Sequence, residues 1–141
     1  MFPSQHKITD SATFRKVIRN GKRAGRSTVV VHLYRENYAH STTSSKDATA
    51  YPHITTGGPR CGLIVSKAVG NAVKRHHLSR WLRVIIMDQI KHNSTLRADR
   101  ELLIVVRLLA PASTASFSQM QQDVSMALEK AYSRLTPLVN T

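Results

Sequence analysis

Apolar residues near the N-terminus recur with a spacing typical of an amphipathic helix. Phe14, Val17 and Ile18 lie three and four residues apart, so their side chains share one helical face. Asp10 or Ser11 stands just before them and can cap the first turn with its side-chain oxygen. We therefore expect a short helix that begins near these residues.

Runs of β-branched and other apolar residues predict strands farther along the chain. They cover residues 28–34, 60–67 and 101–107, and the segment 22–25 is a candidate for a further short strand. The run at 101–107 is too short for a stable helix, which favours a buried strand.

Two longer segments have the helical period. The first covers about residues 71–92, and the second begins at Ser116 and Gln119, which together make a capping box. The apolar stripe of the second helix comprises Phe117, Met120, Val124, Ala127, Leu128, Ala131 and Leu135. The resulting order, αβββαβα, predicts an α/β sandwich with helices packed on one sheet.

The length of 141 residues is typical of a single domain, so we expect one domain over residues 1–141. The segment 36–59 is rich in Ser, Thr and Gly and lacks an apolar period, which predicts a long surface loop rather than a domain boundary. The N-terminal segment lacks the pattern of a signal peptide, and no apolar run is long enough to span a bilayer. Together with the single Cys61, which cannot form an intrachain disulfide, this predicts a cytoplasmic location and no membrane partner.

Charge points to the class of partner. The chain has 21 Lys and Arg against 8 Asp and Glu, a net charge of +13, which favours a polyanionic partner such as nucleic acid. The basic residues concentrate in segments 1–35 and 60–83, and residues 48–87 contain no acid. Solvated surfaces normally mix both signs, so solubility alone explains this segment poorly.

The helix expected at 71–92 separates its apolar and basic residues. One flank carries Leu78, Trp81, Leu82, Ile85, Ile86 and Gln89, and the other carries His76, Arg80 and Arg83, with Arg75 between them. Guanidinium groups bind phosphate oxygens through paired hydrogen bonds. The pattern therefore predicts one flank buried on a sheet and one that contacts phosphates.

The stretch VSKAVGNAVKRHHLSRWLR, residues 65–83, resembles the signature of the bacterial ribonuclease P protein component. Segments DSATFRKVIRNGKRAGR (10–26) and ELLIVVRLLAPA (101–112) resemble the first helix and last strand of the same family. The resemblance implies a protein subunit that binds a catalytic RNA and the 5′ leader of precursor tRNA. It also implies a left-handed βαβ crossover, although the right-handed form is the general rule.

The resemblance also implies site residues. The expected contacts with the catalytic RNA are Lys67, Asn71, Lys74, Arg75, His76, His77, Arg80 and Arg83. His76 and His77 replace an Asn and an Arg of the family pattern, which would make RNA binding somewhat more sensitive to pH if either imidazole contacts a phosphate.

A second implied site is a groove for the single-stranded leader, in which bases stack on aromatic side chains above basic groups. The expected leader contacts are Phe14, Arg15, Lys16, Ile18, Arg26, Val31 and Arg107. Ile18 and Val31 stand at positions that are often aromatic in the family, so the stacking surface is expected to be small.

Hydrolysis is expected to belong to the RNA subunit and its bound Mg²⁺, with no catalytic residue and no metal site in the protein. The eight acids form no recognisable cluster for two metal ions. His76 and His77 diverge by about 100° on a helix, so they are poorly placed to act as an acid–base pair on one phosphate.

Two other classes compete with this interpretation. A basic scaffold, such as a ribosomal protein, would bind structured RNA without aiding hydrolysis and would not need a leader groove around Phe14. A DNA-binding protein is less favoured, because no helix with base-reading Asn or Gln side chains is evident.

Overall fold

The computed structural model describes residues 7–35 and 59–135. The loop expected at 36–59 lies outside the described residues except for Pro59. The elements are α1 (Ser11–Asn20), β1 (Lys22–Gly25), β2 (Val29–Arg35), β3 (Arg60–Ile64), η3 (Lys67–Val69), α3 (Ala72–Lys91), α4 (Ser94–Ala98), β4 (Leu102–Leu108), η4 (Ala110–Thr114) and α5 (Phe117–Leu135). The expected α/β order is confirmed, and the short helix α4 is an addition that the sequence pattern did not predict.

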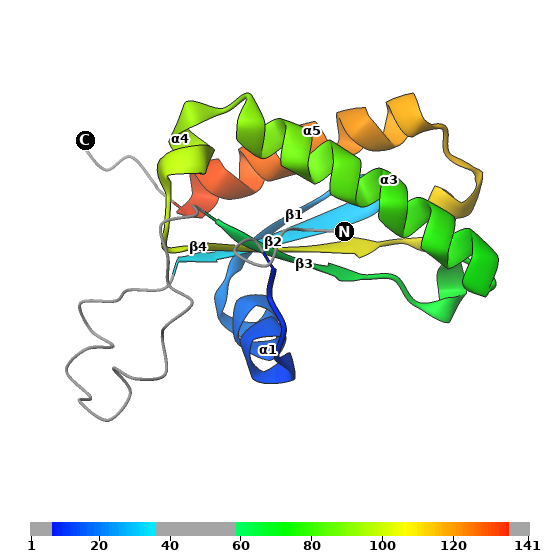
Figure 1. Cartoon of the computed structure of the whole chain (residues 1–141), viewed down its shortest axis with the longest axis horizontal. Coiled ribbons are helices and arrows are strands. Elements are labelled where there is room, and N and C mark those ends of the chain that lie inside the picture. The colour runs from blue at the N-terminus through cyan, green and yellow to red at the C-terminus, as the bar shows by residue number, and fades with distance from the viewer. Residues whose placement is uncertain (1–6, 36–58, 136–141) are drawn as a thin grey trace.

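The four strands form one sheet in the order β1-β2-β4-β3 (Figure 1). Strand β2 is antiparallel to both of its neighbours, whereas β3 and β4 are parallel. A parallel pair needs a crossover connection, which here contains α3. The left hand of this crossover stays an expectation from the resemblance.

Helices cover the two faces of the sheet unequally. Figure 1 shows α3 and α5 on one face, which we call the closed face, and α1 on the other, which we call the α1 face. Val29, Val31 and Leu33 of β2 are fully buried in the core of the closed face. Because side chains alternate along a strand, the residues between them lie on the α1 face.

A buried carboxylate fixes α5 to the start of β2. Asp123 of α5 accepts hydrogen bonds from the Thr28 hydroxyl at 2.7 Å, the Thr28 backbone N–H at 3.3 Å and the Ser27 hydroxyl at 3.2 Å. Such bonds stabilise a buried carboxylate that would otherwise lose its hydration. This contact sets the position of α5 over the β1–β2 turn.

The third strand is shorter than the sequence pattern predicts. It ends at Ile64, and Lys67 begins the 3-10 turn η3, which Ser66 caps by accepting a bond from the Ala68 N–H at 3.3 Å. The prediction that Lys67 ends a strand is therefore wrong. None of the described helices is long and apolar enough to cross a membrane.

Candidate nucleic-acid interface

The start of α3 is fixed by a local turn and a side-chain cap. Gly70 has a φ of 151°, a conformation that favours glycine because it has no Cβ. Asn71 then caps the helix, since its side-chain oxygen accepts a hydrogen bond from the Lys74 N–H at 2.9 Å. The motif that suggested RNA contact is thus also the motif that starts the helix, and the Asn71 oxygen is engaged in the cap.

Helix α3 buries one flank and exposes the other, as its sequence predicts. Leu78, Leu82, Ile85, Ile86 and Ile90 are buried. Lys67, Lys74, His76, His77 and Arg80 are exposed, and Arg75 and Arg83 are half-buried. We call Lys74, Arg75, Arg80 and Arg83 the basic ridge. The burial matches the predicted arrangement, while the RNA-binding role of these side chains stays a prediction.

An aromatic cluster supports the middle of this helix. The ring of Trp81 lies 4.7 Å from the ring of His77 and 5.4 Å, edge to face, from that of Phe117, measured between centroids. His77 is therefore held by packing on Trp81, although its side chain is exposed. This contact orients one of the two histidines that depart from the family pattern.

The α1 face has a small apolar patch beneath the helix. Val17 of α1 packs there with Leu103 and Val105 of β4, and Phe14 and Ile18 lie half-buried at its margin. Phe14 lies so close to Gly62 of β3 that a Cβ built on this glycine would stand 2.3 Å from the ring. Glycine at this position makes room for the aromatic side chain.

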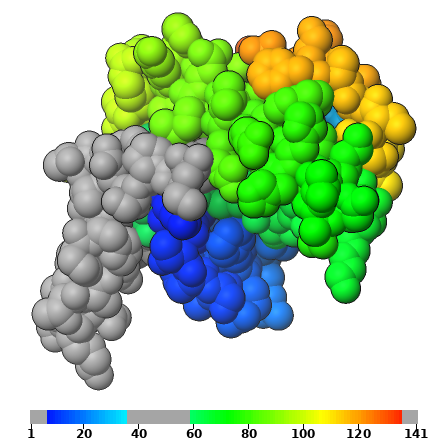
Figure 2. All heavy atoms as spheres, turned by 45° about the vertical axis from the view of Figure 1, so that its right-hand side comes forward, coloured from blue at the N-terminus to red at the C-terminus, as the bar shows by residue number. Residues whose placement is uncertain are grey.

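A cavity of about 190 Å³ joins the two predicted contact sets. It is lined by Lys7, Ile8, Phe14, Cys61, Gly62, Leu63 and Arg83. Phe14 is an expected leader contact and Arg83 an expected RNA contact, so the structure brings one residue of each set to one hollow. Figure 2 shows α1 and the first part of α3 as neighbouring ridges with a hollow between them.

His32 is a residue of the α1 face that the sequence interpretation missed. It is 2% exposed, and neither ring nitrogen has a hydrogen-bond partner. Burial, followed by the nearby charges of Arg107 and Arg23, lowers its pKa below the ordinary value of 6.5. A neutral imidazole presents one donor and one acceptor, but both ring nitrogens are enclosed, so a ligand would meet them only after a local rearrangement.

The pairing register of the strands places two basic side chains near this histidine. Arg23 pairs with His32 across β1 and β2, while Arg107 of β4 pairs with Val30. Side chains of paired residues project from the same face of a sheet, so both arginines belong to the α1 face. Arg107 was expected here, and its Nε atom is buried without a partner.

Two expected leader contacts do not reach this face. Val31 is fully buried in the core of the closed face, so its assignment to the leader groove is wrong. Arg26 lies beside the buried Asp123 of α5, with 3.8 Å between its Nε and a carboxylate oxygen. The alternation of side chains along the strand was the signal that could have assigned His32, rather than Val31, to the α1 face.

The remaining expected leader contacts lie on α1. Arg15 is exposed, and Lys16 and Ile18 are half-buried. The helix is capped by Asp10, whose pKa is lowered chiefly by its hydrogen bond with the Thr13 side chain. The cap fixes the first turn and with it the position of Phe14.

The described residues contain no group of three His, Cys, Asp or Glu side chains that could hold a metal ion. Burial raises the pKa of the Cys61 thiol to about 12, so this side chain stays protonated and is a poor nucleophile. What the described residues of the α1 face and the basic ridge offer is positive charge and one half-buried aromatic ring, which are groups that can bind RNA.

Comparison with known proteins supports the class of protein that the fold and the basic face suggest. The family model described as Ribonuclease P matches residues 2–132. The chain belongs to this family, that of the protein component of the endoribonuclease ribonuclease P. The resemblance found in residues 65–83 is thereby confirmed.

Individual relatives are similar over nearly their whole length. The ribonuclease P protein component of Corynebacterium diphtheriae is 50% identical, with 92% of this chain and 96% of the relative covered. That of Corynebacterium glutamicum is 42% identical, with 93% and 95% covered.

Solved structures show the same fold. The RNase P protein of Staphylococcus aureus superimposes with a TM-score of 0.66 at 23% identity, covering 89% of this chain and 94% of that one. The RNase P protein of Thermotoga maritima gives 0.59 at 18% identity, covering 89% and 94%.

Proposed function

We propose that this chain is the protein subunit of a ribonuclease P, in which it binds the catalytic RNA and the 5′ leader of precursor tRNA. The basic ridge of α3, together with Lys67, is the proposed contact for the catalytic RNA. The α1 face is the proposed leader site, with Phe14 as the stacking residue and Arg15, Lys16, Ile18 and Arg107 beside it. His32 lies on the same face but is 2% exposed, so it is not one of the proposed contacts.

One observation carries this proposal above all. Phe14 and Arg83 line the same hollow of about 190 Å³, although they come from helices on different faces of the sheet. A strand of RNA on the α1 face would therefore run directly to the basic ridge. This arrangement favours one continuous surface that binds the substrate and the RNA subunit together.

The proposal assigns hydrolysis to the RNA subunit and its bound Mg²⁺. The polypeptide would position the leader and screen the repulsion between two polyanions. Because divalent ions also screen this repulsion, the protein should matter most when they are scarce. A cytoplasmic location is part of the same proposal.

The experiment is to measure cleavage of precursor tRNA by the RNA subunit, with and without the protein, across Mg²⁺ concentrations. We expect the benefit of the protein to shrink as Mg²⁺ rises. An equal benefit at every Mg²⁺ concentration would contradict the proposed screening role.

The alternative is a scaffold that binds structured RNA without a leader site. In that case, substitution of Phe14 and Lys16 should weaken binding of precursor and mature tRNA equally. In a leader-binding protein the substitutions should weaken only the precursor substantially. The half-buried position of Phe14 at the margin of the α1 face favours the leader-binding protein.

A further inference from the structure

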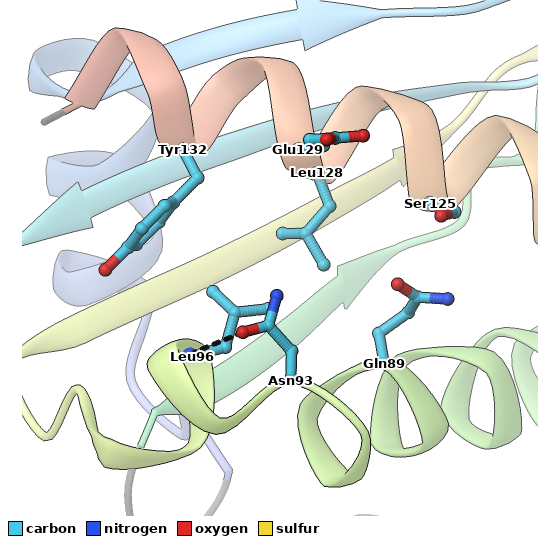
Figure 3. Close-up of a pocket in the computed structure, with 7 residues that line it drawn as sticks. All are labelled: Gln89, Asn93, Leu96, Ser125, Leu128, Glu129 and Tyr132. Carbon is cyan, nitrogen blue, oxygen red and sulfur yellow. Dashed lines mark hydrogen bonds between the residues drawn. The ribbon is translucent and has the colours of Figure 1, made fainter. Parts of the chain in front are cut away.

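A second cavity lies on the other side of the molecule, where α3, α4 and α5 meet. It has a volume of about 290 Å³. Its lining residues are Gln89, Asn93, Leu96, Ser125, Leu128, Glu129 and Tyr132 (Figure 3). We call it the three-helix pocket. It belongs to the helical layer of the closed face, so a ligand there would not contact the α1 face (Figure 1).

The lining of this pocket carries a negative charge, unlike the basic ridge of α3. Among the described residues that line it, Glu129 is acidic and none is basic, in a chain whose net charge is +13. The pocket also adjoins the last turn of α3, because Gln89 and Asn93 lie on either side of the helix end at Lys91. The negative end of α3 is already met by Arg97, whose guanidinium donates to the Lys91 carbonyl oxygen at 2.7 Å, so Glu129 is the acidic group left to attract a cation in the pocket.

The interior combines an apolar floor with hydrogen-bonding groups. Leu96 and Leu128 are buried, and Figure 3 shows both side chains in the space between the helices. The oxygen of Asn93 is engaged, since it accepts bonds from the N–H groups of Thr95 at 3.0 Å and Leu96 at 3.1 Å. The Asn93 NH₂ group consequently remains the part of this side chain that can donate to a ligand oxygen.

Tyr132 forms a fixed wall of the pocket. Its hydroxyl donates to Asp99 at 3.1 Å, and Asp99 in turn forms an ion pair with Arg35 at 2.8 Å. The guanidinium of Arg35 lies 6.0 Å from the centre of the Tyr132 ring. The network holds the aromatic ring in one orientation, so the wall is formed before any ligand binds.

We propose that the three-helix pocket binds a small organic cation, namely a protonated amine on an apolar body that carries a hydroxyl group. The ammonium group would bind the Glu129 carboxylate. The apolar body would lie on Leu96 and Leu128, and the hydroxyl group would accept from the Asn93 NH₂ group. This inference uses none of the residues of the proposed RNA and leader sites.

The test is an NMR titration of the full chain with tyramine and with tyrosol. The two probes have the same phenol and two-carbon linker and differ only in an ammonium or a hydroxyl group at the end. We expect saturable shifts at the backbone amides of Ser125, Leu128 and Glu129 with tyramine. Because a hydrogen bond to a charged group is lost, tyrosol should bind at least about tenfold more weakly.

Variants distinguish the site from general attraction to a cation. E129Q should reduce the affinity for tyramine by about the same factor, since it removes only the charge. E101Q is the matched control, because it removes an acid that does not line the pocket, and its affinity should equal that of the wild type. Equal binding of tyramine and tyrosol, unchanged binding by E129Q, or shifts confined to other surfaces would each overturn the proposal.

Discussion

The two faces of the sheet are built from alternate residues of the same strands, yet they differ in almost every property. On the closed face, Val29, Val31 and Leu33 are fully buried beneath α3 and α5. On the α1 face, a single helix of 10 residues covers a smaller patch, and the buried His32 lacks hydrogen-bond partners. The closed face is thus covered by packed helices, whereas the α1 face keeps half-buried residues, among them Phe14, Ile18 and Val30, that a ligand can contact.

Along β2, residues that stabilise the core therefore alternate with residues that face the candidate binding site. Odd-numbered residues of β2, from Val29 to Leu33, contribute mainly to the core, whereas the even-numbered residues between them lie on the side of the candidate site. Substitutions of neighbours in the sequence should therefore change different measured quantities.

Removal of a core side chain from the closed face should have the largest effect. Leu33 is fully buried, so L33A should lower the free energy of unfolding by about 2–5 kcal/mol. Urea denaturation followed by circular dichroism measures this change. V30A, on the α1 face and half-buried, is the control and should cost clearly less. Similar losses in both variants would contradict the division between the faces.

Removal of the half-buried aromatic ring should chiefly affect substrate binding. F14A should weaken the affinity of the reconstituted holoenzyme for precursor tRNA by about 1–3 kcal/mol, the usual contribution of one stacked base. Affinity for mature tRNA, which has no leader, should change little. F14L preserves apolar packing on Gly62 and serves as the control for a local change in fold. An equal loss for both tRNAs would favour the scaffold.

Loss of one cation from the basic ridge should affect RNA binding uniformly. R80Q removes an exposed guanidinium and should reduce the slope of log affinity for the catalytic RNA against log salt by about 1. Binding measured at several salt concentrations gives this slope. R97Q, an exposed position on α4, should leave the slope unchanged. A slope altered equally in both variants would refute a localised ridge.

The smallest effect should be the dependence of stability on pH through His32. Its pKa is lowered in the folded protein, so the unfolded chain binds the proton more readily. The free energy of unfolding should therefore decrease as pH falls below about 6.5, the ordinary value. H32F has no histidine to protonate at this position. As the pH is lowered from 7.5 to 5.5, its free energy of unfolding should therefore rise relative to that of the wild type. A constant difference across this range would exclude the effect.

The sequence was sufficient for those features that depend on local pattern. The helical spacing of Phe14, Val17 and Ile18, the helical period of residues 71–92 and the apolar run at 101–107 predicted elements that the structure confirms. The face of the sheet on which each β2 residue lies was harder to predict, because three consecutive valines give no alternation of apolar and polar residues. Val31 was therefore placed on the wrong face, and His32 was overlooked.

Long-range contacts were also beyond the reach of pattern. Asp123 holds the β1–β2 turn from 95 positions away in the chain, and no local rule predicts that Arg26 should lie beside it. The hollow shared by Phe14 and Arg83 likewise depends on tertiary structure. The basic residues of α3, by contrast, could be identified from the amino-acid sequence alone, because their spacing within the family motif is local.

The most direct test of the account is where the leader lies on the protein. A precursor tRNA with a photoreactive 4-thiouridine in its leader would be cross-linked to the reconstituted holoenzyme, and the modified peptides would be mapped by mass spectrometry. We expect cross-links within residues 14–18 and at Val30 and Tyr34, which are half-buried on the α1 face. Cross-links concentrated on the outer surface of α5, with none on the α1 face, would contradict it.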